Sequence, residues 1–341
     1  MEGHILYSKQ FGFRNNRSTA LALIDLINNI SSAIDRNETT LGIFLDLSKA
    51  FDTINHEILC QKLQHYGIRD TALAWIKSYL DDRPQFVQFG SHRSYPRKNF
   101  MWRPAGLNSW TSFVYYLLYD LPNVSSLTQS LLFADDTSIF CSHKDASHLF
   151  SIVNNELAKI IIWLKVNKLS LNLTKTNFMS FHPRQKKVNV NVPLTLENTV
   201  IKQVMETKFL GVLIDQHLSW KPHIDFVSQK ILKSVGIIAK AHFYLSFQTL
   251  MILYYSLVYP FLTYCNVAWS FTYCSNLHCI YLLQKRLVRL ITKAHYLANK
   301  PLYLASLKSS TYLVLIHFLS LLLCILITII FCLVAFVTCS K

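Results

Sequence analysis

Acidic residues occur inside two apolar, strand-like stretches of this chain, and that combination restricts what it can fold into. Residues 40–47 read TLGIFLDL, with Asp46 near the end, and residues 129–140 read QSLLFADDTSIF, with Asp135 and Asp136 between two apolar runs. The second stretch predicts a β-hairpin whose tip carries both carboxylates. Like-charged groups beside buried strands are destabilising unless cations neutralise them. We therefore expect the strand end and the hairpin tip to lie together around bound cations.

Three converging carboxylates suit the binding of divalent cations. Two Mg²⁺ ions about 3.5 to 4 Å apart need carboxylate oxygens from different strands, so that one activates an attacking hydroxyl and the other stabilises a leaving pyrophosphate. The pattern therefore predicts phosphoryl transfer with Asp46, Asp135 and Asp136 as ligands of two Mg²⁺, with Mn²⁺ as the alternative ion. An Asp-Asp dipeptide is also common in solvated turns. The apolar flanks and the separate LDLSKAFD segment favour the metal site over that alternative.

The periodicity of the other apolar residues predicts an α+β fold. An amphipathic helix is expected after the start signal at Ser18 and Thr19, followed by the strand at residues 40–47 and a helix within residues 52–67. The other expected elements are a helix capped by Asp70, a hairpin around Gly90 and Ser91, a helix over 149–164, short strands at 177–181 and 209–214, and basic helices from Ser219 to Ile238 and from Leu282 to Ile291.

The charge balance predicts a polyanionic partner. The chain has 34 Lys and Arg against 19 Asp and Glu in 341 residues, a net charge of +15, and its length suits about two domains. Basic residues interleaved with Phe, Tyr and Trp are typical of proteins that contact phosphates and stack bases. A merely soluble basic surface stays open as the alternative. The basic positions include Arg14, Arg17, Arg97, Lys98, Arg184, Lys186, Lys187, Lys285, Arg286, Arg289 and Lys293.

The eight cysteines contain no CxxC pair, and no signal peptide opens the chain, so we expect reduced thiols in an intracellular setting. Cys265, Cys274, His278 and Cys279 form a cluster that could be imagined as a zinc site. Structural zinc sites usually pair their ligands at spacings of two to four residues, and this stretch is otherwise aromatic and apolar. The spacing therefore disfavours zinc.

The C-terminal segment has the composition of a membrane helix. Residues 309–340 contain no charged residue, and residues 313–338 are almost wholly apolar. At about 1.5 Å per residue, that stretch is long enough to cross a hydrocarbon core of roughly 30 Å. We expect a transmembrane helix here, with a buried core helix as the alternative. Lys308 and Lys341 flank the segment on both sides, so the charges give little indication of orientation.

Five blocks of the sequence, in the same order and at plausible spacing, carry a specific resemblance. The chain resembles non-LTR retrotransposon reverse transcriptases of the jockey-like kind over about residues 8–300. The blocks are QFGFRNNRST at 10–19, FLDLSKAFDTINHEIL at 44–59, LLFADDTSIF at 131–140, NKLSLNLTKT at 167–176 and KFLGVLIDQHLSW at 208–220.

The resemblance implies a right-hand polymerase fold. Its antiparallel palm sheet, with helices and incomplete fingers, would occupy residues 1–216, its helical thumb residues 217–308, and the hydrophobic tail residues 309–341. The implied activity is that of an RNA-directed DNA polymerase, with an RNA template, a DNA primer and deoxynucleoside triphosphates as partners. The family's location would be the nucleus or cytoplasm, with the membrane as the alternative if the tail spans it, and the oligomeric state stays open.

The resemblance also assigns roles to single residues. Asp46 would be the metal ligand of the FLDLSKAFDTINHEIL block, and Asp135 and Asp136 the pair in the LLFADDTSIF block. Lys175 would protonate the departing pyrophosphate as a general acid, and Gly211 would lie in a turn that supports the primer. Phe51 matches the position that crowds a ribose 2′-hydroxyl, and backbone amides from Leu47 to Ala50 would face the triphosphate. The predicted substrate-binding residues are Arg14, Leu47, Ser48, Lys49, Ala50, Phe51 and Gly106.

The chain departs from the family pattern in one block. Around residues 102–110 the family reads close to GVPQGSVLG, whereas this chain has Ala105 and Leu107 in place of the Gln and Ser that help to hold template and nucleotide. The chain also begins just before the QFGFR block. These departures predict a truncated copy with incomplete fingers. The alternative reading is a catalytically inactive, nucleic-acid-binding remnant of such an element.

Overall fold

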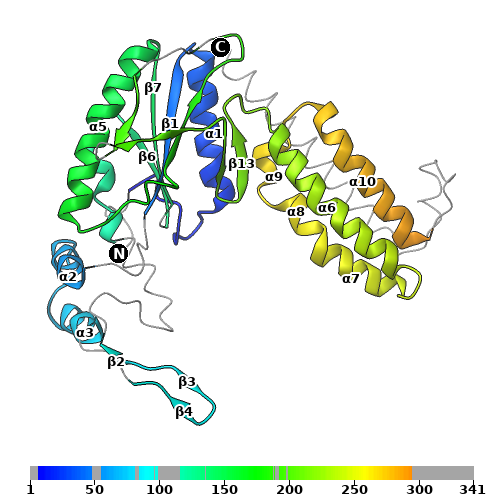
Figure 1. Cartoon of the computed structure of the whole chain (residues 1–341), viewed down its shortest axis with the longest axis horizontal. Helices are drawn as coiled ribbons and strands as arrows, with labels where there is room; N and C mark the ends of the chain where they lie inside the picture. The colour runs from blue at the N-terminus through cyan, green and yellow to red at the C-terminus, as the bar shows by residue number, and fades with distance from the viewer. Residues whose placement is uncertain are drawn as a thin grey trace. The chain divides into compact units, whose positions relative to one another are not determined.

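A sheet built around the strand that ends in Asp46 organises the first part of the chain (Figure 1). The computed structural model describes residues 7–47, 55–80, 84–95, 97–98, 116–134, 136–186, 188, 192–196 and 199–293. The chain divides into two compact units, Met1–Leu210 and Gly211–Lys341. The first unit combines a sheet with helices, and the second is mainly helical. The predicted α+β class is therefore confirmed.

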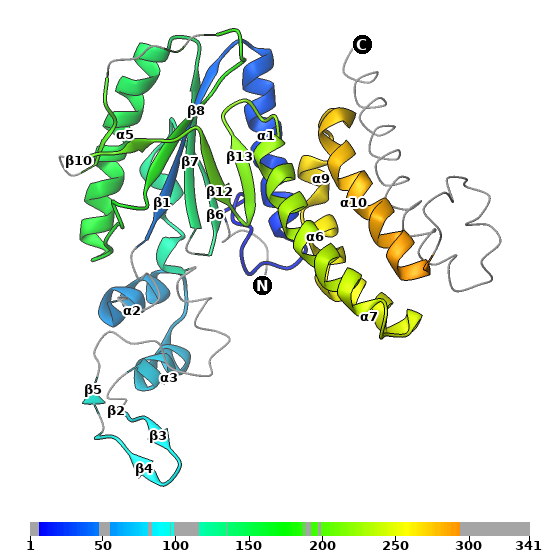
Figure 2. The ribbon, with the colours of Figure 1, turned by 45° about the vertical axis from the view of Figure 1, so that its right-hand side comes forward.

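The first unit contains a five-stranded sheet in the order β11, β8, β1, β7, β6 (Figure 2). The central strand β1 is antiparallel to both of its neighbours, and β6 is antiparallel to β7, whereas β11 runs parallel to β8 at the edge. The strands are β1 Thr39–Asp46, β6 Gln129–Phe133, β7 Asp136–His143, β8 Asn177–Phe181 and β11 Lys202–Gln203. The predicted strand at 40–47 and the predicted acidic hairpin are therefore confirmed.

Two long helices cover the opposite faces of this sheet, α1 (Thr19–Asp35) and α5 (Ala146–Val166) (Figures 1 and 2). Ile43 of β1 and Ile139 of β7 belong to one buried cluster with the apolar face of α5. Ser18 caps α1 as predicted, because its hydroxyl accepts a hydrogen bond from the amide of Leu21. A strand buried on both faces is expected to be continuously apolar, which is how β1 reads.

Shorter elements complete the first unit. Helices α2 (His56–His65) and α3 (Asp70–Leu80) contribute to the same core cluster as α5. The predicted hairpin around Gly90 is confirmed: β3 (Gln88–Phe89) pairs with β4 (His92–Arg93). The remaining elements are β2 Pro84–Gln85 paired with β5 Arg97–Lys98, the 3₁₀ helix η1 Leu121–Val124, β9 Thr195–Leu196 paired with β10 Thr199–Val200, and β12 Glu206–Phe209.

The single strand predicted at 209–214 is wrong. The structure has β12, which ends at Phe209, and a separate strand β13 (Val212–Asp215). Leu210 and Gly211 between them have φ angles of 45° and 83°. Strand residues need a negative φ, so the chain must turn at this point. The turn that the family resemblance implied at Gly211 is therefore present.

The second unit is mainly helical. Its longest helices are α6 (Lys221–Ala241) and α10 (Cys274–Thr292), which pack against each other. The apolar stripe predicted on α6 is buried, including Ile224, Ile231 and Ile238. Between these helices lie α7 Phe247–Leu257, α8 Tyr259–Thr263 and α9 Asn266–Trp269.

His223 at the start of α6 makes the stability of this unit dependent on pH. Its side chain is 3% exposed, and its Nδ1 accepts a hydrogen bond from the amide of Leu213 at 3.3 Å. Burial lowers the pKa of His223 to about 4. The unfolded chain therefore binds this proton more readily than the folded chain, and stability falls as the pH drops from about 6.5 to about 4, by at most about 1.4 kcal/mol per pH unit.

Replacing His223 by Asn keeps a hydrogen-bond acceptor and removes the titration. We expect denaturant unfolding of His223→Asn to vary less between pH 7 and pH 5 than unfolding of the unaltered chain. The exposed His278 of α10 supplies the control, because His278→Asn should keep the full pH dependence. Equal pH dependence of the unaltered chain and His223→Asn would contradict the assignment.

The predicted transmembrane helix at 309–341 lies outside the described residues. Within the part of the chain that the structure describes, no helix combines the length and the apolar character needed to cross a bilayer.

Candidate active site

Asp46 and Asp136 lie directly opposite each other on adjacent strands. The antiparallel register of β1 and β7 makes them Cα partners, one at the end of its strand and the other at the beginning. Directly paired residues point to the same face of a sheet, with Cβ atoms roughly 4.5 to 5.5 Å apart. Both side chains are accessible, with 39% of the Asp46 side chain exposed. The two carboxylates therefore face the same volume of solvent at the open end of the sheet.

A turn after α5 brings Lys175 to this pair. The amide of Asn172 donates to the carbonyl oxygen of Asp46 at 2.8 Å, and the amide of Asp46 donates to the hydroxyl of Thr176 at 3.4 Å. These bonds attach both ends of the turn to the end of β1. Lys175 between them places its Nζ 3.7 Å from Oδ2 of Asp46. This contact holds the ammonium group near the carboxylate. Because 71% of the Lys175 side chain is exposed, the group can still move.

Sequence reasoning identified Lys175 but missed Asn172 and Thr176. Both residues bond to the backbone of Asp46. These contacts join segments about 130 residues apart, so the periodicity of apolar residues does not reveal them. The signal that could have found them is local. Asn172, Thr174 and Thr176 are residues whose side chains stabilise turns by bonding to nearby backbone, and Thr176 does so by donating to the carbonyl oxygen of Asn172.

Asp46, Asp136 and Lys175 share a small open cavity of about 150 Å³. Lys208 of β12 also lines it and adds a second cationic side chain that the sequence analysis did not single out. Phe44 of β1 packs against Phe209 of β12, with ring centroids 5.7 Å apart, and so fixes β12 beside the cavity. The other lining residues are Leu45, Thr137, Ser138, Asn177, Thr207, Phe209 and Leu210.

The chemistry of these residues fits a divalent metal ion. Carboxylate oxygens are the ligands that Mg²⁺ prefers, and like charges directly opposite in a sheet destabilise each other unless a cation lies nearby. Lys175 supplies one positive charge near Asp46. Among the described residues no group of three or more His, Cys, Asp or Glu is arranged to hold a metal. This includes Cys265, Cys274, His278 and Cys279, so the zinc alternative is not supported.

Other predicted site residues lie elsewhere or cannot be placed. Leu47 is buried and forms a β-bridge with Leu171. Arg14 is half-buried and donates to the carbonyl oxygen of Tyr7 at 2.9 Å. The predicted site residues outside the described residues are Ser48, Lys49, Ala50, Phe51, Gly106 and Asp135.

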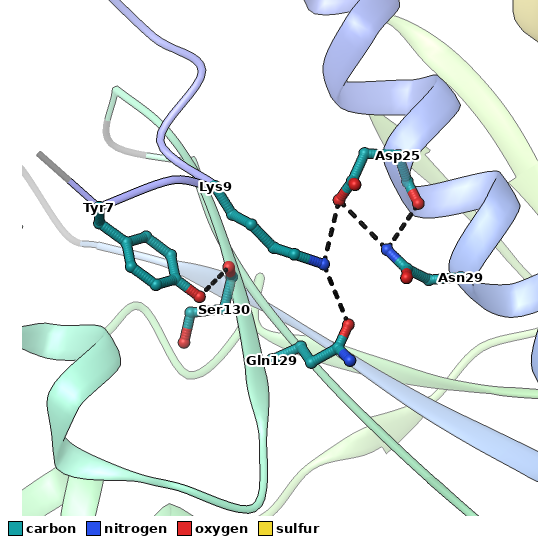
Figure 3. A network of polar contacts seen from close by, with 6 residues as sticks. All are labelled: Tyr7, Lys9, Asp25, Asn29, Gln129 and Ser130. Carbon is teal, nitrogen blue, oxygen red and sulfur yellow. Dashed lines mark hydrogen bonds and ion pairs between the residues drawn. The ribbon is translucent and has the colours of Figure 1, made fainter.

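The N-terminal segment runs along β6 toward the same hairpin tip. Lys9 bridges two elements, contacting Asp25 of α1 at 3.3 Å and donating to Gln129 of β6 at 3.2 Å, and Tyr7 donates to the carbonyl oxygen of Ser130 (Figure 3). The backbone of residues 9–11 exchanges two hydrogen bonds with Leu132. Gly12 follows and lies so close to the tip that a Cβ on it would be 2.5 Å from the backbone nitrogen of Ala134.

An antiparallel sheet with a strand-end carboxylate facing a hairpin carboxylate is the arrangement that the sequence predicted for a polymerase palm. The chain belongs to the reverse transcriptase (RNA-dependent DNA polymerase) family, whose model matches residues 4–214.

The relatives that the chain matches are transposon proteins. It is 27% identical over 316 residues to a probable RNA-directed DNA polymerase from transposon BS of Drosophila melanogaster. That alignment covers 86% of this chain and 33% of the relative. It is 24% identical over 296 residues to the RNA-directed DNA polymerase from mobile element jockey of the same species, covering 84% and 32%. The predicted jockey-like relationship is therefore confirmed. The chain spans about a third of the length of these relatives.

Among solved structures, the chain is similar to telomerase from Candida albicans. The TM-score is 0.37 at 12% sequence identity, and the match covers 81% of this chain and 48% of that one.

Proposed function

We propose that this chain is an RNA-directed DNA polymerase domain that extends a DNA primer on an RNA template with deoxynucleoside triphosphates. The observation that carries the proposal is the pairing of Asp46 with Asp136 in the register of β1 and β7. A protein that only bound nucleic acid would have no need for two carboxylates that face each other, because they repel a phosphate backbone. Such a pair is useful where cations mediate between carboxylates and phosphates.

Within this proposal Asp46 and Asp136, together with Asp135, hold two Mg²⁺ ions. When bound, such ions activate the primer 3′-hydroxyl and stabilise the charge of the leaving pyrophosphate. Asp46 is fixed for this role by the two backbone bonds from the turn at residues 172–176. We assign the palm of a right-hand polymerase to residues 1–216 and the helical thumb to residues 217–308.

Lys175 and Lys208 supply the positive charge at the rim of the cavity. Lys175 is close to Asp46 and largely exposed, so its ammonium group can approach the leaving pyrophosphate and donate a proton to it. Lys208 lines the same cavity and is exposed, which suits it to contact a phosphate group of the substrate.

Primer extension by the purified chain tests the proposal. A DNA primer annealed to an RNA template should be extended in the presence of dNTPs and Mg²⁺, and not when the metal is chelated or the template is left out. Lys175→Ala should slow a single nucleotide addition by about 10²- to 10⁴-fold, the usual contribution of a general acid. Lys144→Ala, which removes an exposed lysine outside the cavity, serves as the control.

A folded chain that binds RNA in a salt-dependent manner, yet adds no nucleotide with Mg²⁺ or Mn²⁺, would contradict the proposal. That result would favour the inactive, nucleic-acid-binding remnant instead.

A further inference from the structure

The side chain of Asn177 forms a bridge between two segments that line the active-site cavity. Asn177 is the first residue of β8, directly after the turn at residues 172–176, and is half-buried. Its Nδ2 donates to the carbonyl oxygen of Lys175 at 3.0 Å, and its Oδ1 accepts a hydrogen bond from the hydroxyl of Thr207 at 3.3 Å. Thr207 belongs to β12 and is 9% exposed. The amide therefore joins the backbone of Lys175 to β12.

The partners of Asn177 determine which way its amide is oriented. A carbonyl oxygen can only accept a hydrogen bond, so the end of the side chain that faces Lys175 must be the amino group. The other end is then a carbonyl oxygen, and the Thr207 hydroxyl can donate to it. Each end of the side chain thus has a partner that suits it. A side chain of the same size without the amide would lose both bonds.

The position of the Lys175 ammonium group depends on how its backbone is held. Because 71% of this side chain is exposed, little packing directs it. On the backbone, the amide of Lys175 donates to the carbonyl oxygen of Asn172 at 3.1 Å, within the turn that is attached to Asp46. The carbonyl of Lys175 is held by Asn177. Lys175 is therefore attached to β1 through its amide side and to β12 through its carbonyl side.

We propose that Asn177 is a positioning residue that, together with Thr207, holds Lys175 where it can donate a proton to the leaving group. Asn177 acts through Lys175 and makes no contact with the substrate in this role. The proposal rests on the proposed function, because it takes Lys175 as the general acid. It adds a second attachment of that acid, to β12, beside the attachment to the strand that carries Asp46.

Removing the bridge should slow a single nucleotide addition. Asn177→Leu keeps the approximate size of the side chain and removes both bonds, and we expect a loss of about ten- to a hundredfold, since a displacement of about 1 Å at a reacting group costs up to that much. Thr207→Val removes only the hydroxyl and should cost about two- to tenfold, the usual contribution of one hydrogen bond. Thr207→Ser keeps the hydroxyl and should extend primers at nearly the unaltered rate.

Asn154 of α5 supplies a matched control. Its side chain makes a bridge of the same kind, donating to the carbonyl oxygen of Pro193 and accepting from the amide of Thr195, both at 3.1 Å. Asn154 does not line the cavity that holds Asp46. Asn154→Leu should therefore leave the rate of nucleotide addition unchanged when it is measured well below the melting temperature.

A double-mutant cycle separates positioning from a general structural role. In a chain that already carries Lys175→Ala, Asn177→Leu should change the rate by less than about twofold, because the residue that it positions has been removed. A structural defect would instead slow both chains by the same factor. Equal losses in the two backgrounds, or an unaltered rate in Asn177→Leu and Thr207→Val, would overturn the proposal.

Binding of pyrophosphate in the presence of Mg²⁺, measured by calorimetry on the full chain, separates this proposal from the previous one. Lys175→Ala should raise the dissociation constant by about tenfold, as for loss of one charge-assisted hydrogen bond, and Asn177→Leu by about threefold or more. The double variant should bind no more weakly than Lys175→Ala alone.

The two measurements together assign each failure. If the coupling between Asn177 and Lys175 appears in pyrophosphate binding but the chain adds no nucleotide, only the polymerase activity fails. If the chain extends primers but the two changes act independently, only the positioning role of Asn177 fails. A folded chain that neither extends primers nor binds pyrophosphate would overturn both proposals.

Discussion

Replacing Asp46 by Asn is expected to slow primer extension by about a thousandfold or more while leaving the fold intact. The change keeps the size of the side chain and removes its charge, so the site loses one of the two carboxylates that face each other at the end of β1 and β7. A metal ligand of this kind contributes several kcal/mol of charge stabilisation in the transition state, and each 1.4 kcal/mol is about tenfold in rate. Single-nucleotide incorporation under single-turnover conditions measures the loss.

For thermal stability we expect Asp46→Asn to cause no loss, in contrast to its effect on the rate. Without metal, the Asp46→Asn change removes the repulsion between two carboxylates on neighbouring strands, so thermal stability should stay the same or rise slightly. Adding Mg²⁺ should raise the melting temperature of the unaltered chain, because a ligand that binds only the folded state stabilises it, and should raise that of the variant much less. A general loss of structure would lower both activity and stability, and is thereby distinguished from loss of a ligand.

Asp35→Asn is a matched control for this prediction. Asp35 is exposed at the end of α1 and does not line the cavity that holds Asp46. Its variant should extend primers and respond to Mg²⁺ as the unaltered chain does. Extension by Asp46→Asn within about threefold of the unaltered rate would remove Asp46 from the metal site.

The parts of the site that could be predicted are those encoded by local patterns. The apolar runs in the sequence predict β1 and the β6–β7 hairpin. They thereby predict that Asp46 lies at a strand end and Asp136 at the hairpin tip. Placing both residues at the open ends of adjacent strands required only that these strands pair. The register that makes them direct partners is known only from the structure, because strand pairing alone does not fix it.

The parts that could not be predicted depend on contacts between distant segments or on single backbone angles. Asn172 and Thr176 hold Asp46 through its backbone, and nothing in their own neighbourhood specifies that partner. The strand expected at 209–214 is interrupted because Leu210 and Gly211 adopt positive φ angles. The apolar pattern continues across that turn. A prediction based on periodicity therefore merges β12 and β13 into one strand. The edge strand β11 has only two residues, both exposed, and therefore no apolar pattern to detect.

Gly12 shows how such a distant contact bears on the site. We expect Gly12→Ala to reduce primer extension by about a hundredfold and to raise the Mg²⁺ concentration needed for half-maximal rate. A Cβ at this position would lie 2.5 Å from the backbone nitrogen of Ala134 and 3.1 Å from the carbonyl carbon of Phe133. Backbone atoms cannot rotate away as a side chain does, so either the N-terminal segment or the hairpin tip must shift.

The N-terminal segment is held in place by several contacts. It is bound to β6 by the backbone bonds of Lys9 and Phe11 with Leu132, and to α1 and β6 by the Lys9 side chain (Figure 3). Asp136 follows Ala134 by two residues, so a shift of the tip displaces its carboxylate. A displacement of about 1 Å at reacting groups can reduce the rate roughly a hundredfold. Because the displaced carboxylate still carries its charge, raised Mg²⁺ should restore part of the activity, which it would not do for Asp46→Asn.

Gly236→Ala separates this effect from a general effect of adding a methyl group. Gly236 lies within α6, and a Cβ there meets nothing within 4 Å. Its variant should keep normal extension and gain up to about 1 kcal/mol of stability, because alanine favours a helix over glycine. Gly12→Ala should instead lose about 1 to 3 kcal/mol, the usual range for overpacking, so extension is measured well below its melting temperature. A Gly12→Ala chain with unaltered rate and unaltered Mg²⁺ requirement would show that the hairpin tip tolerates the contact and that Gly12 does not position Asp136.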